Sequence, residues 1–439
     1  MNIGEYIKEK TSGLVKENER LTLLKSTISA SSDKLSTAIA VSELLTFATM
    51  ARVRVNIPTG LMPVNGLTFV IAPSGMGKDK SVNEVRSVFE PFYDRIHKYI
   101  QKIEYDNADE EGDYKTIRPL IGGSKPTMQG MLSHFSSLQP HRVGGGYIFS
   151  SEFGAELQKS AAMLEVLELV SVLYDSGNYQ PDYRVSDKLQ MSELKGLNVT
   201  ALFVSSPANI VDDQGTVQKF YSEFKSKLSR RALFCYIDKA PKKTMSVEDL
   251  LSSENAHIDR SSKAKEQMHD YLSKFKLKLD NILELDPEVW DLYTILKEYF
   301  RLKAEDIENE AFKLNINDTP WRALKLAGAF AYLEQAKTVS IRHLSEALWC
   351  YAKYEDDMKE FSELIEMEEY EKFHKYMIDN EVHEISFHEL AKMGFVKMTT
   401  TVGKQVEQML LMANTLSDGV YQIRQSKVFA STDLWGTKK

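Results

Sequence analysis

The sequence contains only two cysteines among its 439 residues, Cys235 and Cys350. They lie far apart and have no second thiol at the short spacing that a zinc module or a disulfide scaffold needs, so both of these classes are excluded. The chain also lacks any apolar run approaching the ~18 residues of a membrane span, and its first residues have no apolar signal-peptide core. We therefore expect a cytoplasmic protein without a membrane span.

Basic residues are in the minority, with 55 Lys and Arg against 63 Asp and Glu, which gives a formal net charge of −8. No overall positive field is available to hold a polyanion, so any nucleic-acid site must be a local patch or a pore. Hydrophobic residues make up 43% of the chain and charged residues 27%, the profile of a globular protein. A chain of this length suggests about two to four domains.

Patterns of buried strands alternate with helical patterns between residues 36 and 240. The apolar runs GLTFVIA, YIFSSEF, NVTALFVSSP and RALFCYID have strand length, and helix-length segments separate them. Such alternation predicts an α/β core with a parallel sheet. Around it we expect a helical arm over residues 1–35 and a linker and helical lid over residues 241–365. A winged-helix-like domain is expected over residues 366–439.

Within the lid region the pattern predicts almost only helix over residues 265–365, because apolar residues recur at helical spacing there. The preceding residues, 239–263, are polar and rich in serine and show no periodicity, so we expect a linker. The last segment has the order helix, helix, wing, but residues 370–439 hold 9 Lys or Arg and 8 Asp or Glu. This near neutrality leaves partner docking as open as DNA binding.

The segment VIAPSGMGKDKS, residues 70–81, follows a buried strand and opens a helix. In this position a glycine-rich loop wraps phosphates with backbone N–H groups and a lysine reaches the β- and γ-phosphates. The P-loop pattern is met except at Ala72 and at Asp79, which stands where a Mg²⁺-binding hydroxyl is usual. The residues predicted to bind ATP are Pro73, Ser74, Gly75, Met76, Gly77, Lys78, Asp79 and Lys80. The alternatives are an ordinary glycine-rich turn and a P-loop that does not hydrolyse.

A P-loop ATPase also needs a carboxylate at the end of a second strand, and YIFSSEF supplies Glu152 as the predicted catalytic residue that polarises water. Ser151 precedes it, where an aspartate is usual. The P-loop has thus gained the carboxylate of Asp79 and the second strand has gained a hydroxyl. Mg²⁺ needs oxygen ligands whichever loop supplies them. We therefore expect a rearranged Mg²⁺ site of Asp79 and Ser151 rather than an inactive one.

Further polar residues are candidates for contacts with the γ-phosphate. Ser206 and Asn209 follow the strand in NVTALFVSSPAN, where a P-loop ATPase places a group that senses this phosphate. Arg230 and Arg231 precede the strand in RRALFCYID and could enter a neighbouring subunit's site as an arginine finger. Arg322 opens the lid segment WRALKLAGAFA. The alternative for each arginine is a structural ion pair or an ordinary helical cation.

The order of these parts, with the motifs APSGMGKDKS, SSEFGAEL, SSPAN and SRRALF, resembles AAA+ replicative helicases of the MCM-like branch. It is more closely similar to predicted helicases and primase-helicases of phages and mobile elements. The resemblance covers residues 36–365 and departs from the family at Ser151 and Ser206, where Asp and Asn are usual. The resemblance implies ATP and Mg²⁺ as cofactors, a homo-oligomeric hexameric ring, single-stranded DNA in its central pore, and replication partner proteins.

An insertion over residues 178–196, NYQPDYRVSDKLQMSELKG, offers cations and an aromatic residue. In helicase rings such an insertion often forms a hairpin that faces the pore, where cations meet phosphates and a ring can stack on a base. The predicted DNA-binding residues are Tyr183, Arg184, Lys188 and Lys195. The alternative is a plain surface hairpin.

These features together predict an ATP-dependent, ring-forming DNA motor, specifically a replicative DNA helicase of a phage or mobile element. One alternative is a loader or remodelling ATPase that does not unwind DNA. The other is a scaffold whose altered P-loop binds a nucleotide without hydrolysing it. ATP turnover with and without single-stranded DNA discriminates among the three.

Overall fold

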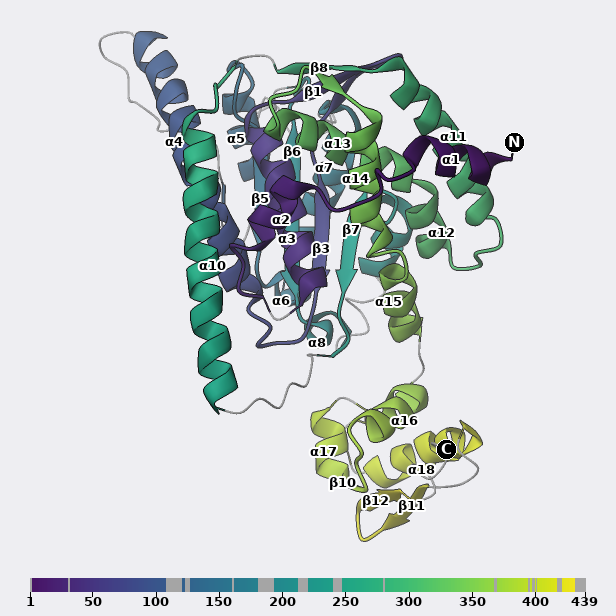
Figure 1. Ribbon diagram of the computed structural model, residues 1–439. Helices are drawn as coiled ribbons and strands as arrows, with labels where there is room; N and C mark the ends of the chain where they lie inside the picture. The colour runs from purple at the N-terminus through teal and green to yellow at the C-terminus, as the bar shows by residue number, and fades with distance from the viewer. Residues whose placement is uncertain are drawn as a thin grey trace, which may run out of the picture. The chain divides into compact units, whose positions relative to one another are not determined.

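The computed structural model describes residues 2–30, 32–107, 121–122, 127–159, 162–180, 193–211, 220–239, 247–278, 281–366, 369–393, 395–396, 399, 401–416 and 421–430. The chain divides into two compact units, Met1–Lys359 and Glu360–Lys439. Figure 1 shows the helices and strands of both. None of the helices in these ranges combines the length and the hydropathy that a membrane crossing requires.

A five-stranded parallel sheet forms the centre of the first unit, which confirms the α/β class and the parallel sheet predicted from the sequence. Its order is β4-β5-β6-β3-β7, so β6 lies between β3 and β5. Because the strands are parallel, the segments that follow them emerge at one edge of the sheet. The strands are β3 (Leu67–Ile71), β4 (Ile121–Gly122), β5 (Gly146–Ser150), β6 (Val199–Ser205) and β7 (Ala232–Tyr236).

Both faces of this sheet are covered, which explains why its central strands are continuous apolar runs. On one face Phe69, Phe203 and Phe234 occupy matched positions on β3, β6 and β7. On the other face the Thr200 hydroxyl lies 2.6 Å from that of Thr49, which belongs to α3 (Asp33–Met50). Helix α3 is buried along nearly its whole length because it also packs against α4 (Lys78–Asn107).

A second sheet joins segments that are far apart in the sequence. Its order is β2-β1-β8-β9, with β1 antiparallel to β2 and parallel to β8. The region expected to be almost wholly helical therefore contributes two strands, too short and too exposed to show a pattern in the sequence. The strands are β1 (Arg54–Ile57), β2 (Gly60–Pro63), β8 (Ile282–Leu285) and β9 (Thr338–Val339).

The rest of that region is helical, and helix replaces part of the expected linker. The prediction of a linker over residues 239–263 is wrong from residue 247 on, because α10 begins there. Ala264, Met268 and Leu272 follow at a spacing of four residues and are buried, so one face of α10 packs although its first half is rich in serine. The helices are α10 (Val247–Ser273), α11 (Pro287–Lys303), α12 (Glu310–Asn317), α13 (Thr319–Leu333), α14 (Ile341–Ala352) and α15 (Asp357–Glu366).

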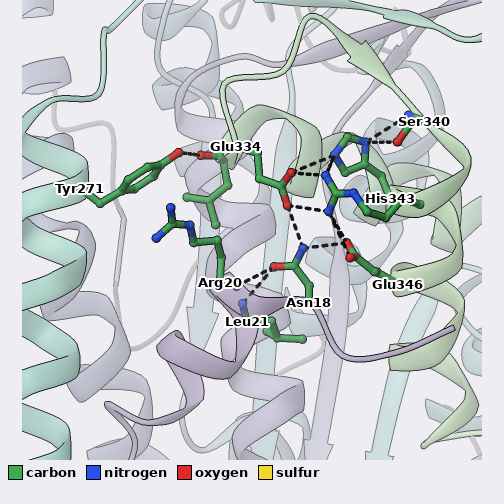
Figure 2. Close-up of polar contacts among 10 residues, drawn as sticks. Asn18, Arg20, Leu21, Tyr271, Glu334, Ser340, His343 and Glu346 are labelled. Carbon is green, nitrogen blue, oxygen red and sulfur yellow. Dashed lines mark hydrogen bonds and ion pairs between the residues drawn. The ribbon is translucent and has the colours of Figure 1, made fainter. Parts of the chain in front are cut away.

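The N-terminal arm consists of α1 (Ile3–Thr11), which packs against α11 and α14, and α2 (Glu19–Lys25), which packs against α3 and α10. Asn18 caps α2 and donates hydrogen bonds to Glu334 (2.9 Å) and Glu346 (2.7 Å), as Figure 2 shows. Burial acts to raise the pKa of Glu334, but hydrogen bonds from His343, Arg342 and Asn18 hold it well below its ordinary value. This cluster ties the arm to α13 and α14.

In its described residues from 369 on, the second unit combines α16, α17 and α18 with a three-stranded antiparallel sheet of order β10-β12-β11. Gln425 and Ser426, with φ of 50° and 59°, form the tight turn between β11 and β12. Phe373, Leu390 and Val406 bring one buried side chain from each helix into a common core. The elements are α16 (Glu369–Asp379), β10 (Glu384–Ser386), α17 (Phe387–Lys392), α18 (Val402–Leu416), β11 (Tyr421–Arg424) and β12 (Lys427–Ala430).

Candidate functional site

A pocket of about 340 Å³ lies at the carboxyl edge of the parallel sheet. Its walls are the segments that follow β3, β5 and β6, which the strand order places side by side. The structure thus brings together three motifs that the sequence analysis found separately. The pocket is lined by Ser74, Gly75, Gly77, Lys78, Asp79, Lys80, Ser151, Glu152, Ser206 and Asn209.

Two glycines allow the predicted P-loop to turn from β3 into α4. Gly75 and Gly77 have φ of +84° and +74°, values that glycine adopts readily because it has no Cβ. Ser81 closes the turn, since its backbone N–H and its hydroxyl both donate to the Gly77 carbonyl, at 2.9 and 2.8 Å. The first residues of α4 line the pocket, and the N-terminus of a helix of this length favours an anion.

Lys78 is held inside the loop by hydrogen bonds to backbone carbonyls. Its Nζ donates to Ala72 O (2.6 Å) and Pro73 O (2.9 Å). Burial lowers the pKa of Lys78, while the carboxylates of Asp79 and Glu152 act in the opposite direction. An anion in the pocket would offer the ammonium group a charged acceptor in place of two neutral ones, and such hydrogen bonds are stronger.

The Glu152 carboxylate lies exposed just before α6 (Phe153–Lys159) and accepts a hydrogen bond from Asn209 Nδ2 at 3.3 Å. Asn209 lies in α8 (Pro207–Val211), where its backbone N–H donates to the Ser206 hydroxyl at 3.4 Å. Gly154 N–H donates to Ser205 Oγ at 3.2 Å, and a Cβ at Gly154 would come within 2.6 Å of that oxygen. This close approach fixes the Glu152 segment against the end of β6.

The predicted metal ligands Asp79 and Ser151 both line the pocket, Asp79 from the segment after β3 and Ser151 from the segment after β5. Among the described residues no group of three or more His, Cys, Asp or Glu side chains forms a metal site. Mg²⁺ does not need such a group, because it is commonly bound through one or two carboxylates together with substrate phosphates and water. A carboxylate, a hydroxyl and room for phosphate therefore fit Mg²⁺ in its substrate-bound form.

The two predicted finger arginines lie at the opposite edge of the sheet. They precede β7, whose first residue Ala232 pairs with Leu67 at the amino end of β3. Arg231 is 11% exposed and its guanidinium lies 2.5 Å from the Asp175 carboxylate, whereas Arg230 is 42% exposed and lies 3.6 Å from it. Neither lines the pocket of its own chain. Arg230, which also lies 4.0 Å from the Asp318 carboxylate, has the more exposed guanidinium of the two.

Arg322, predicted to contact the γ-phosphate, is 2% exposed in α13. Its guanidinium donates to the backbone carbonyls of Ser229 (3.3 Å), Arg230 (3.0 Å) and Asn315 (2.7 Å). These carbonyls lie near the amino end of β7. The structure therefore does not bring Arg322 to the pocket and uses it instead to hold the Arg230 segment against α12 and α13.

Lys325, one turn later in α13, is also buried and makes no ion pair among the described residues, although the Asp175 carboxylate acts to raise its pKa. Its Nζ donates to Pro63 O (3.0 Å), Asn65 Oδ1 (2.6 Å) and Tyr174 O (2.8 Å). Burial lowers the pKa of Lys325 to about 7, against an ordinary value of 10.5. This lysine joins α13 to the loop between β2 and β3.

Three of the four residues predicted to bind DNA lie outside the described residues, namely Tyr183, Arg184 and Lys188. The fourth, Lys195, is exposed and its Nζ lies 2.8 Å from Glu193. An antiparallel bridge between Tyr179 and Leu194 closes the base of the insertion. The hairpin itself therefore stays a prediction.

Sequence patterns do not single out Asp175, although its carboxylate pairs with both Arg230 and Arg231. It lies in the last turn of α7 (Ala162–Ser176), where a cation rather than an acidic residue is usual. That unfavourable position is the one local sign that Asp175 has an ion-pair partner elsewhere in the chain. Only the fold brings Asp175 next to Arg231, which lies 56 residues further along the chain.

A comparison of the sequence with protein-family models finds no matching model, and a comparison with curated proteins finds no significant match. The assignment of a function therefore depends on the geometry of the pocket and on the motifs that line it.

Proposed function

We propose that this chain is an ATP-hydrolysing motor that acts on DNA, in the manner of a replicative helicase of a phage or mobile element. The observation that carries the proposal is the single pocket in which the glycine-rich loop, Lys78, Glu152 and Asn209 meet. Each of these would be unremarkable alone. Their convergence at the carboxyl edge of a parallel sheet, where α/β proteins bind nucleotides, supports a nucleotide site.

In this proposal the residues divide the work of phosphoryl transfer. The loop N–H groups and Lys78 bind the β- and γ-phosphates, and Glu152 orients and deprotonates the attacking water while Asn209 positions its carboxylate. Asp79 and Ser151 hold Mg²⁺, which when bound would neutralise charge on the phosphates. Ser206 supports Asn209 through its hydroxyl.

A ring completes the proposed site, because the pocket has no arginine of its own among the residues that line it. Arg230 would enter from the neighbouring subunit as a finger. The helices α11 to α14 would form the lid of an AAA+ core, and the second unit would be a winged-helix-like domain. The single strand of DNA would pass through the ring, with replication proteins as partners in the cytoplasm of the host cell.

ATP turnover, measured with and without single-stranded DNA, tests the proposal. We expect Mg²⁺-dependent turnover that DNA stimulates and that Lys78→Ala abolishes together with ATP binding, because the variant removes the cation nearest the phosphates. A matched control is Lys98→Ala, which removes an exposed cation from α4 far from the loop. Turnover that survives Lys78→Ala would remove the P-loop assignment.

Two alternatives make different predictions in the same assay. A loader or remodelling ATPase would show DNA-stimulated turnover but no unwinding of a forked duplex. A nucleotide-binding scaffold would bind ATP without turnover. The bonds from Lys78 to Ala72 O and Pro73 O are the observation that favours the scaffold, because they occupy the ammonium group that catalysis needs.

A further inference from the structure

A second cavity, of about 300 Å³, lies where the end of α10 meets β8 and β9. Three lysines form part of its wall: Lys276 and Lys278 from the segment after α10, and Lys337 from the segment before β9. Figure 1 shows β8 at the end of the first unit opposite to α6 and α8, which flank the nucleotide pocket. The lysine cavity and the nucleotide pocket are therefore separate.

The three lysines are exposed, and within the part of the chain that the structure describes none makes an ion pair or a side-chain hydrogen bond. Lys274, only two residues before Lys276, instead pairs with Asp270 at 2.7 Å. One carboxylate, Glu284, also lines the cavity, and it accepts a hydrogen bond from Asn56 Nδ2 at 2.9 Å. The lining therefore carries an excess of positive charge in a chain whose net charge is −8.

The cavity wall also contains a hydrogen-bond donor without an internal acceptor. Tyr332 is 5% exposed, and its hydroxyl has no hydrogen-bond partner among the described residues. Its ring is fixed by contacts with Phe275 and Phe47, at centroid distances of 5.2 and 5.3 Å. Arg95 adds a further cation behind the wall, where it donates to the Phe275 carbonyl at 2.9 Å. A hydroxyl without a partner and cations without an anionic partner among the described residues are what a site for an anion requires.

We infer that this lysine cavity binds phosphate groups, and specifically the backbone of single-stranded DNA at a point distant from the ATP pocket. Three neighbouring lysines without partners suit a row of phosphates, since each can neutralise one charge and release one counterion. The cavity contributes no exposed aromatic ring for stacking, because Phe275 and Tyr332 are buried. Binding here is therefore independent of base sequence. The assignment to DNA rests on the proposed function, whereas the phosphate site itself does not.

The salt dependence of DNA binding tests this inference quantitatively. The triple variant Lys276→Gln, Lys278→Gln, Lys337→Gln removes three cations without adding a charge of opposite sign. For single strands the slope of log K against log salt is negative, and each lost phosphate contact reduces its magnitude by ~0.7. We therefore expect the magnitude of the slope to be smaller by ~2 in the variant. Between 50 and 200 mM salt the affinity gap between wild type and variant should then shrink by a factor of roughly 20. Oligo-dT labelled for fluorescence anisotropy is the probe.

A matched control carries the same number of substitutions on exposed lysines elsewhere, Lys98→Gln, Lys263→Gln and Lys297→Gln. This control should keep the wild-type slope. Equal slopes for wild type and the site variant, with DNA binding intact, would overturn the inference and leave the proposed motor untouched. A slope lowered equally in the control would also overturn it, because the effect would then be one of net charge.

Tripolyphosphate provides an arm that does not depend on DNA. If wild type binds tripolyphosphate at the lysine cavity but does not bind oligo-dT, the phosphate site stands, while its assignment to DNA and the proposed motor both fail. To exclude the ATP pocket, this titration is done in the Lys78→Ala background, where loss of binding in the additional triple variant identifies the cavity. Absence of tripolyphosphate binding together with unchanged DNA binding in the triple variant refutes the site altogether.

Discussion

The buried lysine of α13 should make the stability of the first unit depend on pH in the alkaline range. Lys325 has a pKa of about 7 in the folded protein and an ordinary value of 10.5. Between these two values the unfolded chain binds more protons than the folded chain, so the free energy of unfolding rises with pH. Below pH 7 both states are protonated and the penalty for burying the charge is present in full, at about 5 kcal/mol for a shift of this size.

The part of this range that is convenient for experiment lies between pH 7 and pH 9. With a folded pKa near 7, deprotonation over these two units contributes about 2 kcal/mol of stability. The variant Lys325→Met cannot show this rise. It also removes the donor: at pH 9 the neutral amine has two N–H groups for the three acceptors Pro63 O, Asn65 Oδ1 and Tyr174 O, and each acceptor left without a donor costs about 1–3 kcal/mol if it stays buried. The variant should therefore be the less stable protein at pH 9, by a margin that shrinks toward pH 7.

Urea unfolding of wild type and Lys325→Met at pH 7, 8 and 9, at constant ionic strength, measures this margin. The difference between the two proteins isolates Lys325 from the other groups that titrate in this range. A difference that stays constant with pH would refute the reasoning, because it would mean that the three acceptors keep the ammonium charged throughout. A variant more stable than wild type at pH 9 would refute the role of the hydrogen bonds.

Four further outcomes are expected. Glu152→Gln should bind ATP with nearly wild-type affinity yet lose turnover, by about 10²–10⁴-fold, as measured by equilibrium binding and phosphate release; an equal loss of binding would place Glu152 in the metal site instead. Arg230→Ala should be inactive alone but regain partial turnover when mixed with an inactive P-loop variant, and no recovery in a verified mixed ring would make this arginine structural. Asp79→Ser should lose Mg²⁺-dependent turnover and recover part of it when combined with Ser151→Asp, whereas normal turnover of Asp79→Ser alone would dismiss the rearranged metal site. The depressed pKa of Glu334 means that its ionised carboxylate stabilises the folded state above its ordinary pKa of 4.5, and that this stabilisation is lost as the pH falls below that value. In thermal melts Glu334→Gln should therefore be less stable than wild type at pH 7 and closer to it at pH 3.5.

The central sheet could be predicted because each of its long strands has a recognisable pattern in the local sequence. The residues of β3, such as Phe69 and Val70, form an unbroken apolar run that ends in a glycine-rich loop, and that pattern depends on burial on both faces. The walls of the pocket could also be predicted, because the residues that follow parallel strands lie at the same edge of the sheet. Glu152 and Asn209 were found separately, and their contact required the position of β6 between β3 and β5, which no local pattern contains.

The arginines show where local patterns fail. Arg322 stands at the start of an amphipathic helix, where a solvent-facing cation is the ordinary expectation, yet its guanidinium is buried against three backbone carbonyls. Two of these carbonyls, those of Ser229 and Arg230, belong to a segment about 90 residues earlier in the sequence, so no local pattern shows that the charge is buried. The same holds for Arg231, whose partner Asp175 has no pattern linking the two. Spacing identifies candidates for chemistry but does not determine which of them face a ligand.

The parallel pairing of β1 with β8 has a consequence for how the protein can fold and be divided. Asn56 and Glu284, which bond across these strands, are 228 residues apart, and closing a loop of that length costs about 3 kcal/mol more entropy than closing a ten-residue one. During synthesis more than half of the chain must therefore be made before β8 can pair with the edge of β1. A fragment ending near residue 240 would leave Arg54 N–H without its acceptor, the Asn281 carbonyl, and would expose β1 as an open edge prone to aggregation. The pocket at the carboxyl edge of the parallel sheet and the helices α11 to α14 therefore fold together as one cooperative unit, and limited proteolysis of the native protein should not separate them.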